Sequence, residues 1–284
     1  MRVPMTISVD VEIESVETWP LEVYELTTQN RDLVIRYQSE RRRIDQLARD
    51  DVMARINPPA NEYSDAYRSL VRQIDAGLAR HRIVGYHCTR LTSSEIAAIL
   101  GSGLKVLSAE LVRDRLDRCV AERQLTQSQR EFLGHSKSLC DGLNNKIGTR
   151  SGLVWFCPKR SALTDSSGFY RLFRSWGGEA LYWGHEENHA IYPVLARIGT
   201  PTIVKCAIPF RTGACVKTFA EHFLSQSVAN EIDYAEPRAS FDLHSKNDVP
   251  PSDVLDIVQF SDSRFEKLTR YSSWPECHGI NVSD

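Results

Sequence analysis

The chain has 284 residues, of which 42% are hydrophobic and 25% charged, as is ordinary for a globular protein. Its formal net charge of -2 excludes a global electrostatic attraction to nucleic acid or to an anionic membrane. No apolar run is long enough to span a bilayer, the opening sequence MRVPMTISVDVEIES lacks the regions of a signal peptide, and the seven cysteines form no C-x-x-C pair. We therefore expect a cytoplasmic protein without membrane contact, disulfide framework or zinc ribbon.

Two amphipathic helices are predicted near the N-terminus. Residues 30–56 are rich in charge and carry apolar side chains at helical spacing, and the pair Pro58-Pro59 ends this helix. Apolar residues between Tyr67 and Leu78 form one stripe on a second helix. We expect these helices to form an N-terminal helical extension of residues 1–80.

The remainder of the chain, residues 81–284, predicts an α+β domain. The sequence Ile83–His87 is apolar and β-prone, and capping boxes at Thr92–Glu95 and Thr126–Gln129 open helices after it. A further helix is expected to contain Arg174–Tyr182. Further strands are predicted at Gly152–Cys157, Thr202–Pro209, Ser240–His244 and Asp253–Phe260. Strands separated in this way by helices predict a small sheet with inserted helices.

The first candidate site lies where the strand Ile83–His87 ends. Thr89 and Arg90 follow His87, and the next helix stops at Gly103-Leu104. Imidazole, hydroxyl and guanidinium groups at a strand end can donate hydrogen bonds to ribose or phosphate oxygens. The alternative is a histidine whose hydrogen bonds are satisfied by the backbone.

The second candidate site contains two adjacent aromatic residues. Trp155 and Phe156 stand in the strand sequence GLVWF, and the sequence RSWGGEAL follows at residues 174–181. Either ring offers the π face on which a flat ligand can stack. The alternative is that both rings belong to the core.

The third candidate site is a pair of carboxylates, Glu231 and Asp233. In an extended stretch residues i and i+2 project to the same face, so both carboxylates can reach one ligand. Glu236 and Asp242 are rival positions, and a solvated acidic loop is the alternative.

In this order, over residues 82–260, the three candidate sites resemble the ADP-ribosyltransferase superfamily. The sequence YHCTR followed by a helix and Gly-Leu is similar to the opening of the rifampicin ADP-ribosyltransferases and the RNA 2'-phosphotransferases. GLVWF followed by RSWGGEAL is similar to the second block of the rifampicin-modifying enzymes. The resemblance implies an α+β fold with a split small β-sheet core and inserted helices, here behind an N-terminal helical extension.

The resemblance also implies the activity, a mono-ADP-ribosyl transfer that uses NAD. His87 would hold the adenosine ribose, an aromatic ring would stack on nicotinamide, and a carboxylate would stabilise positive charge at the ribose anomeric carbon. The expected NAD-binding residues are His87, Thr89, Arg90, Trp155 and Phe156, and the expected catalytic residues are Asp233, Glu231 and His87.

A zinc metalloprotease is the main alternative function. The sequence HEENH at residues 185–189 matches H-E-x-x-H, which on a helix places both histidines on one face with Glu186 as general base. Gly184 before the motif and Pro193 after it argue against a long helix.

The acceptor of the transfer is expected to be RNA, DNA or a protein. The stretch Arg36–Arg43 can contact phosphates, although such a stretch is more often a solvated helix face. An intracellular transferase of this kind suggests a toxin or defence effector, with a neutralising partner if it is a toxin. Two neighbouring alternatives are RNA 2'-phosphotransfer, for which Arg90 is the only well-placed arginine, and a catalytically inactive NAD-binding module.

Overall fold

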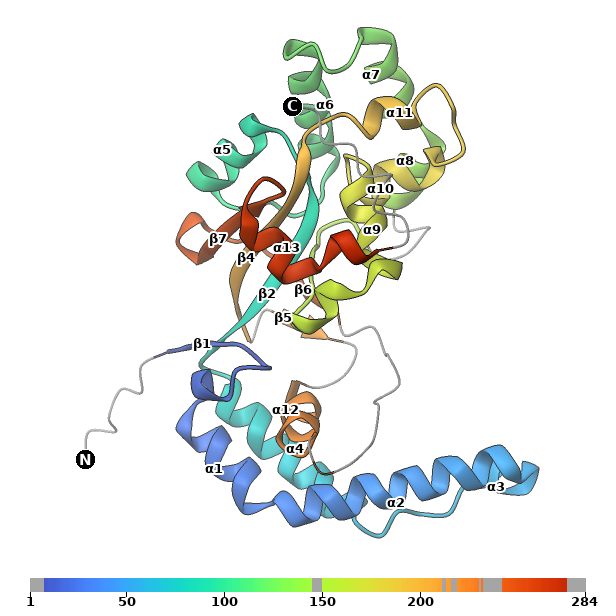
Figure 1. Ribbon diagram of the computed structural model, residues 1–284, viewed down its shortest axis with the longest axis vertical. Coiled ribbons are helices and arrows are strands. Elements are labelled where there is room, and N and C mark those ends of the chain that lie inside the picture. The colour runs from blue at the N-terminus through green and yellow to red at the C-terminus, as the bar shows by residue number, and fades with distance from the viewer. Residues whose placement is uncertain are drawn as a thin grey trace. The chain divides into compact units, whose positions relative to one another are not determined.

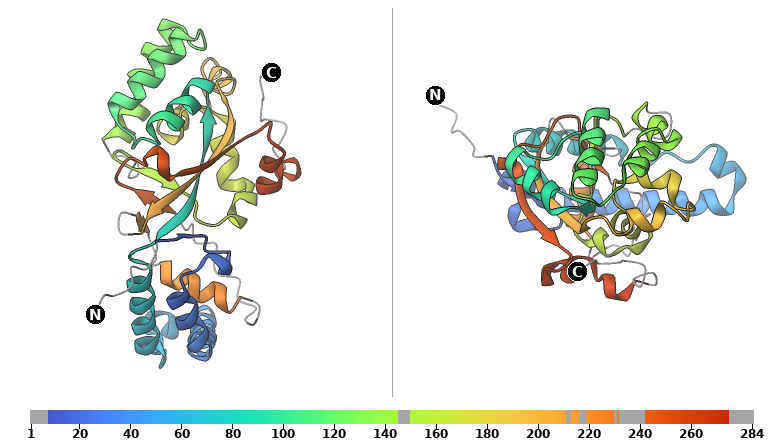
Figure 2. Two further views of the ribbon diagram at one scale, coloured as in Figure 1. Left: turned by 90° about the vertical axis from the view of Figure 1, so that its left-hand side faces the viewer. Right: turned by 90° about the horizontal axis from the view of Figure 1, so that it is seen from above.

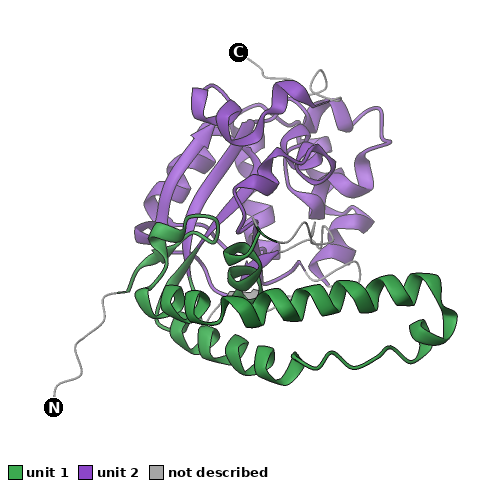
Figure 3. Ribbon diagram, turned by 60° about the horizontal axis from the view of Figure 1, so that its bottom comes forward, with its two compact units in different colours: residues 1–83, 209–211, 215–241 green, residues 84–208, 212–214, 242–284 purple. Residues whose placement is uncertain are grey.

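The computed structural model describes residues 8–144, 150–210, 213–215, 219–229, 231 and 242–274. In this part of the chain many helices surround small sheets in a mixed α/β architecture (Figure 1). None of the described helices is long and apolar enough to cross a membrane. The chain divides into two compact units (Figure 3), one of Met1–Ile83, Pro209–Arg211 and Cys215–Phe241 and the other of Val84–Ile208, Thr212–Ala214 and Asp242–Asp284. The sequence predicted a single boundary after residue 80, whereas the first unit also takes in Cys215–Phe241.

The first unit is mainly helical. Its elements are β1 (Asp10–Val11), η1 (Val16–Thr18), α1 (Leu21–Gln29), α2 (Arg31–Asp50), α3 (Val52–Ile56), α4 (Ser64–Leu78) and α12 (Phe219–Ser227). The apolar stripe predicted between Tyr67 and Leu78 is buried on α4. The single helix predicted over residues 30–56 is interrupted at Asp51, because this residue adopts an extended backbone and its side chain caps α3 by accepting from the Met53 amide.

Strand β2 (Arg82–Leu91) carries the chain from the first unit into the second. The other strands are β3 (Val154–Phe156), β4 (Thr200–Pro209), β5 (Gly213–Cys215), β6 (Leu243–Ser245) and β7 (Val254–Gln259). One sheet has the order β1-β2-β4-β7, with the long strands β2 and β4 at its centre (Figures 1 and 2), and the other has the order β3-β6-β5. A bridge between Tyr86 and Cys157 links β2 to the end of β3, and antiparallel pairing places Trp155 of β3 opposite His244 of β6. Each of the five predicted strand segments thus contains a strand, with residues 240 and 241 lying outside the described residues.

Helices between the strands complete the second unit. They are α5 (Ser93–Ser102), α6 (Ala109–Ala121), α7 (Gln127–Gly134), α8 (Lys137–Leu143), η2 (Ser161–Thr164), α9 (Ser166–Arg174), α10 (Glu179–Tyr182), η3 (Trp183–His185), α11 (Tyr192–Leu195), η4 (Pro251–Asp253), α13 (Ser263–Thr269) and η5 (Tyr271–Ser273). The capping boxes predicted at Thr92 and Thr126 are present. The single helix predicted through residues 174–182 is wrong, because α9 ends at Arg174, where Ser175 adopts an extended backbone, and Gly177 and Gly178, with φ angles of 100° and 68°, separate it from α10.

Two apolar clusters hold the second unit together. One lies among β2, β4, β7 and the adjoining helices, and includes Val84, Phe173 and Phe265. The other is helical and contains Leu116 and the fully buried Trp176.

Candidate functional site

His87 of β2 makes contact with β3. Its half-buried side chain places Nδ1 2.9 Å from the carbonyl oxygen of Trp155. Since a carbonyl oxygen only accepts hydrogen bonds, Nδ1 carries the proton and Nε2 presents a lone pair. Burial lowers the pKa of His87, the hydrogen bond to Trp155 opposes this shift, and the positive charge of Arg115 adds to it. The lowered pKa favours a neutral imidazole, whose Nε2 can accept a hydrogen bond, rather than the donor that the sequence suggested.

Trp155 is the more exposed of the two candidate aromatic residues. Its ring is half-buried, with the His244 ring centroid at 4.8 Å and the Arg150 guanidinium carbon 5.3 Å from the ring centroid. Arg150 is in turn paired with Glu179. Phe156 points to the opposite side of β3, where it is 2% exposed and belongs to the interior. Of the two rings, Trp155 is thus the one that a ligand can reach.

Asp242 is the predicted carboxylate that lies next to β6, the strand paired with that of Trp155. It directly precedes β6, and the charges of Arg150 and His244 both act on it. Although the residue as a whole is exposed, partial burial of its carboxyl group raises the pKa of Asp242, and these two neighbours oppose the shift. The β3–β6 pairing therefore brings a carboxylate to the neighbourhood of Trp155.

The other predicted carboxylates do not join this cluster within the described residues. Glu231 belongs to the first unit, where Arg31 Nε donates to its carboxylate at 3.0 Å. Asp233 and Glu236 lie outside the described residues.

Arg90 is an interior residue. Its guanidinium donates to the carbonyl oxygens of Ile198, Phe173 and Gly199 at distances of 3.0, 3.0 and 2.5 Å, and its side chain is fully buried. Burial lowers the pKa of Arg90 to about 10. Arg90 thus ties β2 to the end of α9 and to the turn before β4, which leaves its guanidinium inaccessible to NAD.

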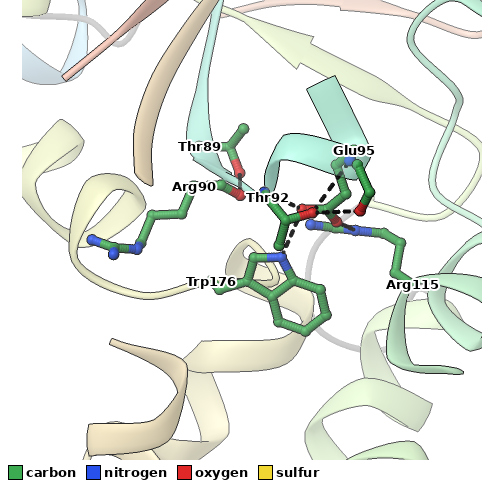
Figure 4. A network of polar contacts seen from close by, with 7 residues as sticks. Thr89, Arg90, Thr92, Glu95, Arg115 and Trp176 are labelled. Atoms are coloured by element: carbon green, nitrogen blue, oxygen red, sulfur yellow. Dashed lines mark hydrogen bonds and ion pairs between the residues drawn. The ribbon is translucent and has the colours of Figure 1, made fainter. Parts of the chain in front are cut away.

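Thr89 is also buried, and its hydroxyl lies 3.4 Å from the Arg90 carbonyl oxygen (Figure 4). Neither residue therefore presents the exposed group that the expected cofactor-binding role of Thr89 and Arg90 requires.

A buried ionic network continues from the end of β2 (Figure 4). The carboxylate of Glu95 accepts hydrogen bonds from the Thr92 amide at 2.8 Å, from Arg115 Nε at 2.5 Å and from Trp176 Nε1 at 2.9 Å. Burial raises the pKa of Glu95, but the charge of Arg115 and these hydrogen bonds outweigh it and hold the pKa below the ordinary value. The capping box identified Glu95 in the sequence, but no signal there paired it with Arg115, which lies on α6.

The segment HEENH does not form the helix that a zinc protease needs. His185 is buried at the end of η3, and the residues after it form a turn that leaves His189 exposed. Glu186 is bound by two arginines, with Arg171 Nε at 2.9 Å and Arg174 Nη2 at 2.8 Å. No group of three or more His, Cys, Asp or Glu side chains that could hold a metal ion occurs among the described residues. The predicted zinc geometry is therefore missing at this segment.

Comparison with protein-family models, with curated proteins and with solved structures finds no match to this chain. The case for a function accordingly depends on the chemistry of the residues described above: a neutral imidazole acceptor, a half-exposed indole ring and a carboxylate of raised pKa.

Proposed function

We propose that the chain is an NAD-dependent ADP-ribosyltransferase whose site consists of His87, Trp155 and Asp242. The observation that carries the proposal is that β2, β3 and β6, which are far apart in the sequence, bring His87, Trp155 and the residue before β6 into one neighbourhood. His87 bonds to the backbone of Trp155, the Trp155 ring contacts His244, and the charge of His244 acts on Asp242. Two of these three residues are the ones that the motif order predicted, and Asp242 was a rival position for the third.

His87 fits a ribose hydroxyl. Its Nε2 is an acceptor, because Nδ1 donates to the Trp155 carbonyl and burial keeps the ring neutral. A sugar hydroxyl can donate to such a nitrogen, whereas a phosphate oxygen without a proton cannot. His87 therefore orients a sugar and leaves any phosphate to other donors.

Trp155 fits a flat aromatic ligand. The bordering residues Arg150 and His244 limit how its ring can turn, and a restrained ring loses little conformational entropy when a ligand stacks on it. Its half-exposed state leaves ring surface for such a contact.

Asp242 supplies the negative charge that the reaction requires. NAD, when bound, supplies a nicotinamide–ribose bond whose cleavage develops positive charge at the ribose anomeric carbon. A fixed carboxylate beside developing positive charge stabilises it more strongly in a partly dry site than in water. The charge of Arg150 favours the ionised form of Asp242 against the effect of its partial burial.

The test is release of nicotinamide from NAD by the purified chain, with and without total nucleic acid and with a chelator present. We expect release that survives chelation and falls at least about 100-fold in His87→Ala and in Asp242→Asn. Stimulation by the nucleic acid fraction would identify RNA or DNA as the acceptor, and stimulation by a protein fraction would identify a protein.

Asp233→Asn is the matched control for the carboxylate. Loss of release in Asp233→Asn with full activity in Asp242→Asn would assign the catalytic acid to the residue first predicted. Binding of NAD without any release by the wild-type chain would instead identify an inactive NAD-binding module.

A further inference from the structure

Six large hydrophobic side chains of the first unit are exposed in two groups. They are Val16, Leu21 and Tyr24 on η1 and α1, and Val52, Met53 and Ile56 on α3. Their exposed fractions lie between 41% and 71%, and they are six of the eleven large hydrophobic side chains exposed in the described part of the chain. Because soluble proteins seldom gather exposed apolar side chains, such a concentration marks a surface that another molecule covers.

The group on η1 and α1 lies among acidic residues. Residues 10–30 carry six carboxylates and neither lysine nor arginine. Leu21, Tyr24 and Glu25 are all exposed, and their spacing places them on one side of α1. The carboxylates of Glu17 and Glu25 are exposed and have no hydrogen-bond or ion-pair partner among the described residues. We call the surface formed by Val16, Glu17, Leu21, Tyr24 and Glu25 the acidic face.

The group on α3 lies among arginines. Residues 41–56, the basic arm, carry five arginines and three aspartates, so their formal charge is +2. Arg49 and Arg55 are exposed, and no acceptor or carboxylate in the described chain pairs with either guanidinium. Two of the aspartates are used within the arm, since Asp50 accepts from Gln46 Nε2 at 2.9 Å and Asp51 caps α3. The charge that the arm offers to a partner is therefore positive.

The acidic face and the basic arm lie at opposite ends of α2 (Figure 1). The twenty residues of α2 make it about 30 Å long, with α1 joined to its N-terminal end and α3 to its C-terminal end. The two surfaces of one chain therefore cannot cover each other. Each combines exposed apolar side chains with charge of the sign opposite to that of the other. A nucleic acid or an anionic membrane would suit the basic arm alone and leave the acidic face uncovered.

We propose that the acidic face binds the basic arm of a second copy of this chain. Opposite charges steer the two surfaces together, and the exposed apolar side chains of both are removed from water in the contact. Since the two surfaces differ, the contact is heterologous, and each bound copy still offers one surface to a further copy. Assembly therefore proceeds head to tail, and it does not depend on the proposed transferase activity.

Sedimentation velocity of the full chain at increasing protein concentration and at two salt concentrations tests the proposal. We expect the mass of the wild-type species to rise with concentration and the association to weaken with salt. The variants Glu17→Lys/Glu25→Lys and Arg49→Glu/Arg55→Glu each place like charges across the contact, so each alone should associate at least about tenfold more weakly. An equimolar mixture of the two variants restores opposite charges and should associate again.

Glu110→Lys/Asp114→Lys is the matched control, because it changes the net charge as Glu17→Lys/Glu25→Lys does but at exposed positions of α6. It should associate as the wild type does. A wild-type chain that stays monomeric at every concentration would overturn the inference. So would a loss of association in only one of the two reversed variants, or a mixture of them that stays dissociated. Circular dichroism of each variant confirms that the helices are intact.

Discussion

The Nδ1 atom of His87 lies 2.9 Å from the carbonyl oxygen of Trp155, and this contact decides which imidazole nitrogen carries the proton. It also joins the two residues that the sequence proposed for opposite ends of one ligand. The hydrogen bond crosses from β2 to β3 next to the Tyr86–Cys157 bridge, so the backbone of both strands holds it in place. His87 is consequently a fixed acceptor.

Nitrogen-15 NMR of the imidazole tests this assignment. We expect the His87 ring to be protonated at Nδ1 and bare at Nε2 at neutral pH, with a pKa below 6.5 because the ring is buried. The resonances can be identified by their loss in His87→Asn. A proton on Nε2, or a pKa of 6.5 or above, would contradict the acceptor role.

Two glycines at the C-terminal end of α5 are expected to respond in opposite ways to alanine. Gly103 ends the helix with a φ angle of 79°, and a Cβ there would lie 2.0 Å from the Val249 carbonyl oxygen. Gly103→Ala should therefore lower the free energy of unfolding by about 3 kcal/mol or more. Gly101 lies within the helix in open space, and Gly101→Ala should raise it by about 0.5–1 kcal/mol.

Urea unfolding of the two variants measures both effects. Equal changes in Gly101→Ala and Gly103→Ala would show that the close approach to Val249 does not exist.

Replacement of Arg90 by lysine tests its structural role. The ammonium group of Arg90→Lys retains the charge, but one nitrogen cannot reach carbonyls of Phe173, Ile198 and Gly199 as the guanidinium does. We expect the free energy of unfolding to fall by about 2 kcal/mol or more, because buried carbonyls lose their donors. The exposed Arg197, whose Nε donates to the Pro193 carbonyl oxygen of α11, supplies the control Arg197→Lys, with an expected change within about 0.5 kcal/mol. Calorimetry on folded Arg90→Lys should return the wild-type affinity for NAD, and a large loss of affinity would favour a direct contact instead.

The buried His185 is expected to make the folded chain less stable in acid. Burial lowers the pKa of His185 below 6.5. At pH values between 6.5 and this lowered pKa, the unfolded chain takes up a proton that the folded chain does not. The contribution to stability is complete above pH 6.5 and decreases as the pH falls. In His185→Gln the free energy of unfolding should change less between pH 8 and pH 5.5 than in the wild type, as urea midpoints at the two pH values would reveal.

The exposed His189→Gln controls for replacement of a histidine in the same loop. An unchanged pH dependence in His185→Gln would indicate that His185 is protonated as readily in the folded chain as in the unfolded one.

The sequence by itself determined the elements that depend on neighbours in the chain. The capping boxes at Thr92 and Thr126 and the apolar stripe of α4 were predicted correctly, because each is made by residues that lie within a few turns of one another. Gly177 and Gly178 were also visible in the sequence, but their positive φ angles depend on where the chain has to turn. The helix predicted across them was therefore wrong.

Only the tertiary structure decided which side chains share a site. Trp176 donates to Glu95 across 81 positions of sequence, and the pairing of β3 with β6 sets Asp242 near the neighbours of Trp155. Burial likewise separated Arg90, whose donors are used by interior carbonyls, from Arg115, whose Nη2 has no partner among the described residues. In the sequence, neither the residue type nor its spacing distinguishes these two arginines. Their difference arises because hydrogen-bond acceptors from distant segments surround the guanidinium of Arg90, whereas Nη2 of Arg115 finds no acceptor in the described chain.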